Sequence, residues 1–121
     1  MVIFDANMIL RYLLRDNESM ANQAKQHLIA GNVVVTIEVI AEAVYVLKGI
    51  YDMDRQEIAD KVMRFLRLVD CRDYDILALA IRTYAEQNLD FVDCVLYAYH
   101  KIRGAEIATF DKKLLKLMAL R

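Results

Sequence analysis

The feature that most constrains this fold is the alternation of short apolar runs with longer segments of helical periodicity. VIF at 2–4, VVVT at 33–36 and IATF at 107–110 are short, and VVVT is entirely β-branched. The segments between them repeat apolar residues every three or four positions, which is the period of an amphipathic helix. Buried strands that alternate with helices form a parallel sheet covered on both faces. We therefore predict an α/β fold.

The same periodicity gives approximate bounds for each element. Helices are expected at 7–15, 18–30, 37–50, 55–68, 74–87, 91–103 and 112–117, with weaker strand signals at 68–71 and 118–120. Thr36 and Asp54 stand where helix N-caps are expected. Gly31 and Gly104 stand where helices are expected to stop. Short strands and longer helices are thus predicted to alternate along the chain.

Composition and length indicate a single compact domain, residues 1–121. The chain is 58% hydrophobic and 27% charged, which excludes a disordered protein. Three glycines and no proline favour helices over a turn-rich β-sandwich. No apolar run approaches the roughly 20 residues of a membrane span. Because Cys71 and Cys94 form no CxxC motif, we expect reduced thiols and a cytoplasmic protein.

Four acidic residues fall where parallel α/β domains bind ligands. Asp5 and Asp111 follow predicted strands, whereas Glu42 and Asp93 lie near the starts of predicted helices. The carboxyl ends of parallel strands and the amino ends of the following helices share one edge of the sheet. Glu42 lies more than one turn inside its helix, which is too deep for a cap. The four carboxylates are therefore candidates for one cleft.

Three of these residues also have a purely structural interpretation. Asp5 could start a turn, with Asn7 capping the first helix. Asp111 precedes a helical segment and could be an ordinary N-cap. Asp93 lies three residues after Asp90 and could complete a capping box with it. The sequence leaves these alternatives open.

The chemistry of a shared carboxylate cleft favours a bound cation. Carboxylates gathered in a partly buried site repel one another, and a divalent cation removes that repulsion. Ligands that are all oxygen favour Mg²⁺ or Mn²⁺ over zinc. His27 and His100 have no metal-like spacing, so we expect them at the surface or at the edge of the core.

Four stretches give the chain a resemblance to a known family. They are VIFDANMILRYLLRD, VVVTIEVIAEAVYVLKGIY, LDFVDCVLYAYHK and ATFDKKL. In this order and spacing they resemble the PIN domain, in particular the VapC-type ribonuclease toxins of bacterial and archaeal toxin–antitoxin pairs. The resemblance covers nearly the whole chain. It implies a three-layer α/β/α fold, commonly dimeric, with a short and mostly parallel sheet of four or five strands.

The resemblance also implies a catalytic site. Matched residue by residue, the family's acidic quartet, which would bind Mg²⁺ or Mn²⁺, is Asp5, Glu42, Asp93 and Asp111. The supporting polar positions are Asn7, Thr36 and Thr109, although Thr36 also fits a simple cap. The implied reaction is RNA hydrolysis, in which an activated water attacks phosphorus and leaves a 5′-phosphate and a 3′-hydroxyl.

Cations beside the acidic cleft are needed to bind the phosphates of an RNA strand. Phosphate contacts come mostly from Lys and Arg. The cations nearest the quartet in sequence, and hence our candidates for RNA contact, are Arg11, Arg15, Lys112 and Lys113.

The resemblance implies a small antitoxin whose tail lies in a groove of the toxin. Tyr12, Tyr45 and Tyr51 could line that groove, or could simply belong to the core.

Other functions remain to be separated from this one. A housekeeping nuclease of the same fold, acting on ribosomal or transfer RNA, would have the same residues. A receiver-type signalling domain usually has an adjacent acidic pair after its first strand, whereas VIFDAN carries one acid. A phosphatase with an aspartate nucleophile needs a second acid where Asn7 stands. A binding protein that has lost catalysis would not need an intact quartet.

Overall fold

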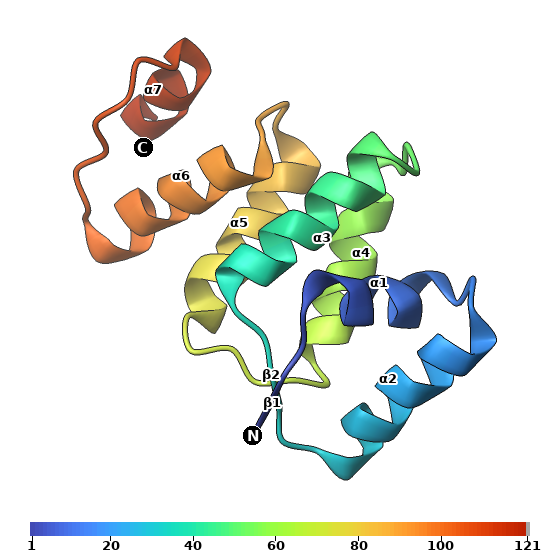
Figure 1. The fold of residues 1–121 in the computed structure, drawn as a ribbon. Coiled ribbons are helices and arrows are strands. Elements are labelled where there is room, and N and C mark those ends of the chain that lie inside the picture. Colours follow the sequence, from blue (N-terminus) through green and yellow to red (C-terminus); the bar gives the residue numbers. More distant parts are fainter. Residues whose placement is uncertain (121) are drawn as a thin grey trace. The chain divides into compact units, whose positions relative to one another are not determined.

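The computed structural model describes residues 1–120 and divides into two compact units, Met1–Arg72 and Asp73–Arg121 (Figure 1). The first unit contains β1 (Val2–Ile3), α1 (Ala6–Leu14), α2 (Glu18–Ala30), β2 (Val33–Val34), α3 (Ile37–Gly49) and α4 (Arg55–Leu66). The second unit contains α5 (Tyr74–Glu86), α6 (Phe91–Arg103) and α7 (Lys112–Ala119). The content is mixed α/β, with helices dominating the described residues.

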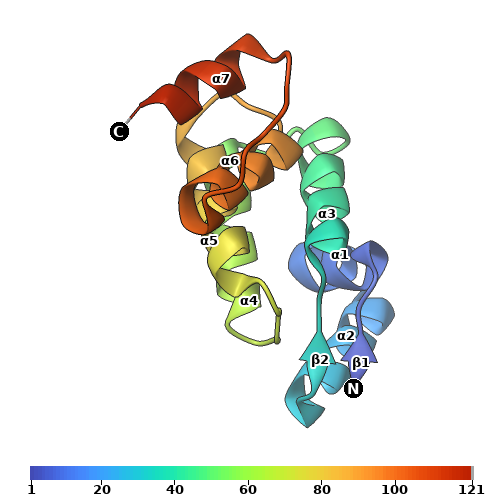
Figure 2. The same cartoon turned by 90° about the vertical axis from the view of Figure 1, so that its left-hand side faces the viewer.

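The sheet of the first unit is small. Strands β1 and β2 run parallel, with Val2 opposite Val33 and Ile3 opposite Val34 (Figure 2). A single parallel bridge joins Val34 to Asp70, whose backbone N–H donates to the Val33 carbonyl at 2.9 Å. The prediction of four or five strands is therefore wrong for residues 1–120, where two strands and one bridge are present.

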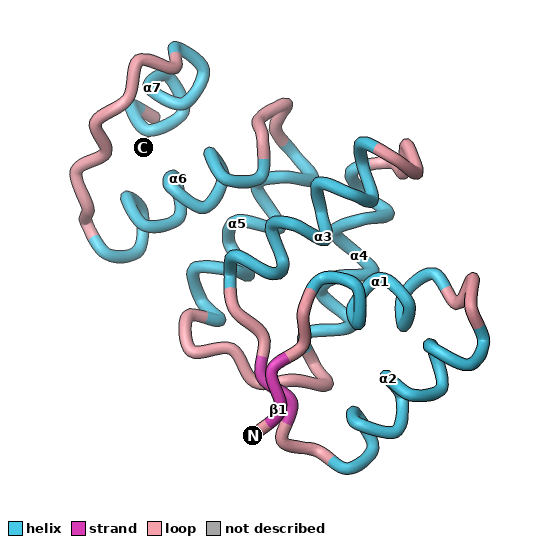
Figure 3. Tube along the Cα trace, in the orientation of Figure 1, coloured by secondary structure: helices cyan, strands magenta, loops and turns pink. Residues whose placement is uncertain are grey.

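Three predicted strands are absent from the described structure. Segment 68–71 contributes only its bridge, 107–110 is loop, and 118–120 overlaps the end of α7 (Figure 3). β-Branched and aromatic residues favour a strand only where a neighbouring strand and a buried face are provided. Phe110, the largest apolar residue of its segment, is instead 101% exposed. Local composition therefore led to the wrong prediction there.

The first strand is also less buried than its sequence suggests. Val2 is 36% exposed and Ile3 is 57% exposed, whereas Phe4 directly after them is buried. Strand β1 has only two residues and pairs with β2 alone, so one of its edges has no neighbouring strand among the described residues. The prediction of a strand is therefore confirmed for Val2 and Ile3, whereas the prediction of burial is correct only for Phe4, which follows the strand.

The helices follow the predicted bounds closely, because their ends are set by local capping. Thr36 Oγ1 accepts a hydrogen bond from the Val39 N–H at 3.3 Å, and Asp54 Oδ2 accepts one from the Gln56 N–H at 3.2 Å. Gly31 ends α2 with φ +78°, a left-handed value that favours glycine. Within residues 1–120, no helix has the length and apolar character needed to cross a bilayer.

The aromatic residues of the first unit fix α4 against the end of β1 and against α1. Phe65 of α4 is 1% exposed, and its ring centroid lies 6.4 Å from that of Phe4 and 5.9 Å from that of Tyr12. Complete burial of a phenylalanine stabilises a fold by about 1.5–3 kcal/mol. Helix α1 also packs against α2 and α3. The chain segment around Asp5 is thereby held between well-packed elements.

In the second unit, α5 packs along α6, and α6 contacts α7. The rings of Tyr84 and Phe91 meet edge to face at 5.9 Å between centroids, close to the start of α6. At the other end of α6, Arg103 forms two hydrogen bonds with the Asp75 carboxylate, at 2.7 and 3.0 Å. Both ends of α6 are therefore tied to α5, which fixes the first turn that carries Asp93.

Candidate functional site

Asp5 is the N-cap of α1. Its Oδ1 accepts a hydrogen bond from the Met8 N–H at 2.9 Å, while its Oδ2 makes no hydrogen bond with the described residues. The alternative in which Asn7 caps the helix is wrong, because α1 begins at Ala6 and contains Asn7 in its first turn. The cap therefore orients the Asp5 carboxylate and leaves one oxygen for another ligand.

Glu42 is exposed in the second turn of α3. Its helix starts at the Thr36 cap, so the structural interpretation of Thr36 is confirmed. Helix α3 packs against α1, which begins at the Asp5 cap. The two acidic residues predicted for the first unit therefore come from a pair of contacting helices.

Asp93 is a half-buried carboxylate without a partner. It lies in the first turn of α6 and makes no hydrogen bond or ion pair with residues 1–120. Asp90 occupies the N-cap position, but its side chain makes no capping hydrogen bond. The capping-box alternative for Asp93 is therefore wrong, and so is the expectation that the Asp90 side chain caps the helix.

The surroundings of Asp93 disfavour its charged form. Partial burial raises the pKa of Asp93 above its ordinary value, and the nearby charges of Asp111 and Asp90 raise it further. Desolvation and like charge both oppose ionisation of a carboxyl group. A cation bound at Asp93 would reverse both effects. The structure thus brings Asp93 and Asp111 into electrostatic range of each other.

Asp111 caps α7 and is itself positioned by Thr109. Its Oδ1 accepts a hydrogen bond from the Leu114 N–H at 2.8 Å, and its own backbone N–H donates to Thr109 Oγ1 at 3.1 Å. The N-cap interpretation of Asp111 is confirmed. As with Asp5, the Oδ2 atom makes no hydrogen bond with the described residues, so capping is compatible with ligand binding.

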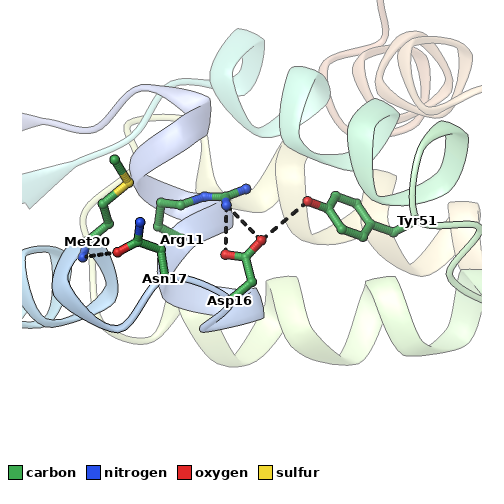
Figure 4. A network of polar contacts seen from close by, with 5 residues as sticks. All are labelled: Arg11, Asp16, Asn17, Met20 and Tyr51. Carbon is green, nitrogen blue, oxygen red and sulfur yellow. Dashed lines mark hydrogen bonds and ion pairs between the residues drawn. The ribbon is translucent and has the colours of Figure 1, made fainter.

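Arg11 has an internal partner that the sequence did not indicate. Its Nη1 lies 2.7 Å from both carboxylate oxygens of Asp16, and the Tyr51 hydroxyl donates to Asp16 Oδ2 at 3.5 Å (Figure 4). Tyr51 and then Asp16 raise the pKa of the Arg11 guanidinium, so its charge is permanent. This network links the end of α1 to the segment that follows α3.

The other predicted cations are placed differently. The Arg15 guanidinium lies over the Tyr12 ring, with Cζ 5.5 Å from the ring centroid, which is within cation–π range. Lys112 and Lys113 are exposed in the first turn of α7, next to Asp111. The structure therefore leaves Lys112 and Lys113 accessible, stacks Arg15 on an aromatic ring, and pairs Arg11 within the first unit.

A basic pocket was missed by sequence reasoning. Helices α1 and α4 line an open pocket of about 340 Å³ to which Arg15, Lys61 and Arg64 contribute. Lys61 and Arg64 are three residues apart and thus on the same face of α4. That spacing is visible in the sequence, but nothing in the sequence places this face beside Arg15.

The donor atoms suit a hard cation. Among residues 1–120, no group of three or more His, Cys, Asp or Glu side chains is arranged to hold a metal ion. The four predicted ligands are nevertheless all carboxylates, and Asp93 is half-buried without a hydrogen-bond partner. Such donors bind Mg²⁺ or Mn²⁺ in preference to softer metals. The quartet as a single site stays a prediction.

Comparison with known proteins gives the family. The PIN domain family model matches residues 2–119 and so includes all four predicted carboxylates. No curated protein and no solved structure matches the chain. The match extends over almost the full length and agrees with the resemblance drawn from four separate stretches. The chain therefore belongs to the PIN domain family.

Proposed function

We propose that this protein is a metal-dependent endoribonuclease that hydrolyses RNA phosphodiester bonds with Mg²⁺ or Mn²⁺. PIN domains are generally metal-dependent nucleases. The observation that carries the proposal here is Asp93, a half-buried carboxylate with no hydrogen-bond partner and with Asp111 in electrostatic range. Partial desolvation and the like charges of Asp111 and Asp90 both disfavour its ionised form. A divalent cation would supply the compensation.

In this proposal the acidic quartet binds the metal, and neighbouring polar residues position it. The proposed ligands are Asp5, Glu42, Asp93 and Asp111. When bound, a divalent cation polarises a phosphodiester oxygen and lowers the pKa of a water nucleophile. Asp5 and Asp111 would offer the oxygen that their capping bonds leave unused. Thr109 and Thr36 hold the backbone near Asp111 and at the start of α3, and Asn7 would contribute from the first turn of α1.

The finer proposal is that the protein is a cytoplasmic toxin of the VapC type. In this proposal, residues 1–121 form one nuclease domain, the protein is a dimer, and a small antitoxin inhibits it. The resemblance of the four sequence stretches supports it. Exposed aromatic and apolar residues at the end of α3 support a protein partner, since Tyr45 is 78% exposed and Ile50 is 73% exposed. A housekeeping PIN nuclease is the alternative. Growth arrest on expression, relieved by a neighbouring small protein, would separate the two.

The decisive experiment is cleavage of structured and unstructured RNA by the purified chain in Mn²⁺, beside Asp93→Asn. We expect metal-dependent cleavage that falls by at least about 10-fold in the variant, because loss of a group that only supports a metal ligand already costs about 10–100-fold. Asp90→Asn is the matched control: it removes the same charge from the same helix end and should keep its activity.

Two results would contradict the proposal. Equal cleavage by wild type and Asp93→Asn would show that the activity comes from a contaminant or from another site. Loss of cleavage in Asp90→Asn to the same extent would show that the charge of the helix end, rather than ligation by Asp93, matters. Calorimetric Mn²⁺ binding by each protein separates a failure to bind metal from an unsuitable RNA.

A further inference from the structure

The pocket between α1 and α4 combines cations with an apolar wall. Its cationic members are Arg15, Lys61 and Arg64, and the rest of its lining is Tyr12, Leu13, Phe65 and Leu68. No aspartate or glutamate is among the described residues that line it. Leu68 is 46% exposed, so part of the apolar wall is open to solvent. The pocket therefore offers both charge and an apolar surface to a ligand.

The charges of this pocket are only weakly compensated. Lys61 lies 4.0 Å from Glu57, at the limit of an ion pair, and the Glu57 side chain is 54% exposed. Exposed pairs of this kind contribute little. Arg64 Nε donates to the Asp60 backbone carbonyl, an interaction that leaves the guanidinium charge in place. Three cations therefore lie together in this pocket although the net charge of the chain is −1. This local positive charge favours binding of an anionic ligand.

Helix α1 connects this pocket to the candidate site. Asp5 caps its start and Arg15 caps its end, with nine helical residues between them. At 1.5 Å per residue the two ends lie about 14 Å apart along the helix. A ligand that extends from Asp5 to the pocket must therefore be an elongated anion, with negative charge repeated along its length.

We propose that this pocket is a subsite for single-stranded RNA, which holds the substrate one helix length away from the scissile phosphate. The inference rests on the proposed nuclease function. Lys61 and Arg64 bind backbone phosphate, and a base lies against Leu68 and the outer face of the Arg15 guanidinium, whose other face lies over the Tyr12 ring. Basic grooves with aromatic platforms are the usual means of holding single strands without sequence preference. An acidic peptide fits the charge, but the link to Asp5 through α1 favours the polynucleotide.

The test measures RNA binding in EDTA, where no cleavage can occur, by fluorescence anisotropy of a labelled single-stranded RNA. The pocket variant is Lys61→Gln with Arg64→Gln. The matched control is Lys25→Gln with Arg82→Gln, which removes two exposed cations outside the pocket. We expect at least a tenfold loss of affinity in the pocket variant alone. Its salt dependence should also fall, by about 0.7 in log–log slope for each phosphate that the variant no longer binds.

A second readout excludes a merely structural effect. In Mn²⁺, the pocket variant should raise KM for long RNA while kcat stays unchanged, because the subsite contributes binding remote from the reacting bond. Thermal unfolding of both double variants should match wild type. A lowered kcat with unchanged KM would overturn the subsite.

The remaining outcomes separate the subsite from the nuclease. Pocket-dependent RNA binding by a wild type that neither cleaves RNA nor binds Mn²⁺ in calorimetry would support the subsite and refute the proposed function. If the wild type cleaves RNA but binds it no more tightly than the pocket variant does, the subsite is refuted and the proposed nuclease function is not. Absence of RNA binding by the wild type, or loss of poly-glutamate binding but not RNA binding in the pocket variant, would overturn the RNA assignment.

Discussion

At the scale of single residues, the candidate carboxylates do structural and chemical work at the same time. Asp5 and Asp111 each use one oxygen to cap a helix, at 2.9 and 2.8 Å from a backbone nitrogen. An N-cap hydrogen bond fixes the orientation of the carboxylate, so the second oxygen is presented in a constant direction. A capping role is therefore no argument against metal binding.

The two roles of Asp5 can be separated by substitution. Asn caps helices about as well as Asp, whereas replacement of a cap by Ala costs about 1 kcal/mol. We expect Asp5→Asn to keep its free energy of unfolding and lose Mn²⁺ binding. Asp5→Ala should lose both. Urea unfolding and calorimetry measure the two properties, and retention of Mn²⁺ affinity in Asp5→Asn would remove Asp5 from the site.

Asp93 should make the metal-free protein less stable as pH rises. Because its folded-state pKa is raised above the ordinary 3.8, the folded state holds this proton more tightly than the unfolded state does. Its contribution to stability is therefore complete below pH 3.8 and is lost as pH rises through the raised pKa. The Asp93→Asn variant has no carboxyl group to ionise at this position, so it does not lose stability in this way. Its Tm at pH 7 should be no lower than that of the wild type.

The measurement is the difference in Tm between wild type and Asp93→Asn in EDTA, from pH 4 to pH 7. Glu86→Gln serves as the control, because Glu86 ends α5 and is not among the charges that raise the pKa of Asp93. A Tm difference that stays constant over this range would show that the surroundings of Asp93 do not disfavour its charge.

At the scale of elements, α1 organises the first unit. Its start carries Asp5, its end carries Arg15, and Arg11 in its last turn binds Asp16 in the following loop. Tyr51, which follows α3, extends this network through its hydrogen bond to Asp16. The Arg11 Nε atom is buried without a hydrogen-bond partner among the described residues, so Arg11 depends on Asp16 for compensation.

Asp16→Asn should destabilise the fold moderately. Charge-assisted pairs contribute about 1.5–3 kcal/mol when desolvated, but the Asp16 side chain is 40% exposed, so we expect about 1 kcal/mol. Glu57→Gln is the control: its ion pair with Lys61 is exposed, and less than about 0.5 kcal/mol should be lost. Urea unfolding at low and high salt provides the measurement, and equal losses in the two variants would contradict the assigned role.

At the scale of the whole molecule, the family match spans residues 2–119 and therefore both compact units. The chain has 17 acidic and 16 basic side chains, so its overall charge does not direct it to RNA. Local arrangements must do so, through Lys112 and Lys113 beside Asp111 and through the basic pocket. Function in this chain thus depends on where charges are gathered and not on their sum.

Metal binding should stabilise the molecule by linkage. Mn²⁺ at 100 times its Kd is expected to add about 2.7 kcal/mol to the free energy of unfolding. For a domain of this size, that raises the Tm on the order of 10 °C. Differential scanning calorimetry in EDTA and in Mn²⁺ tests this. We expect Mn²⁺ to leave the Tm of Asp93→Asn unchanged and to raise the Tm of Asp90→Asn as much as that of the wild type. Equal rises in Tm in the two variants would show that the metal binds elsewhere.

Local sequence was enough to predict the helices, their ends and the family. Caps such as Thr36 and stops such as Gly31 act within a few residues of their own position, so reading local spacing was sufficient. The four acidic positions were also visible, because each lies at the end of a predicted strand or near the start of a predicted helix. The signals that predicted these features all lie within one or two helical turns of the residues concerned.

Packing between distant elements determined the rest. Whether 107–110 forms a strand depends on a partner strand, which local composition cannot specify. The Asp16 partner of Arg11, the half-buried position of Asp93 and the meeting of Arg15 with Lys61 and Arg64 all depend on the tertiary structure. Burial and charge proximity are properties of space and not of sequence distance, so the candidate site could be predicted as a set of residues but not as an arrangement.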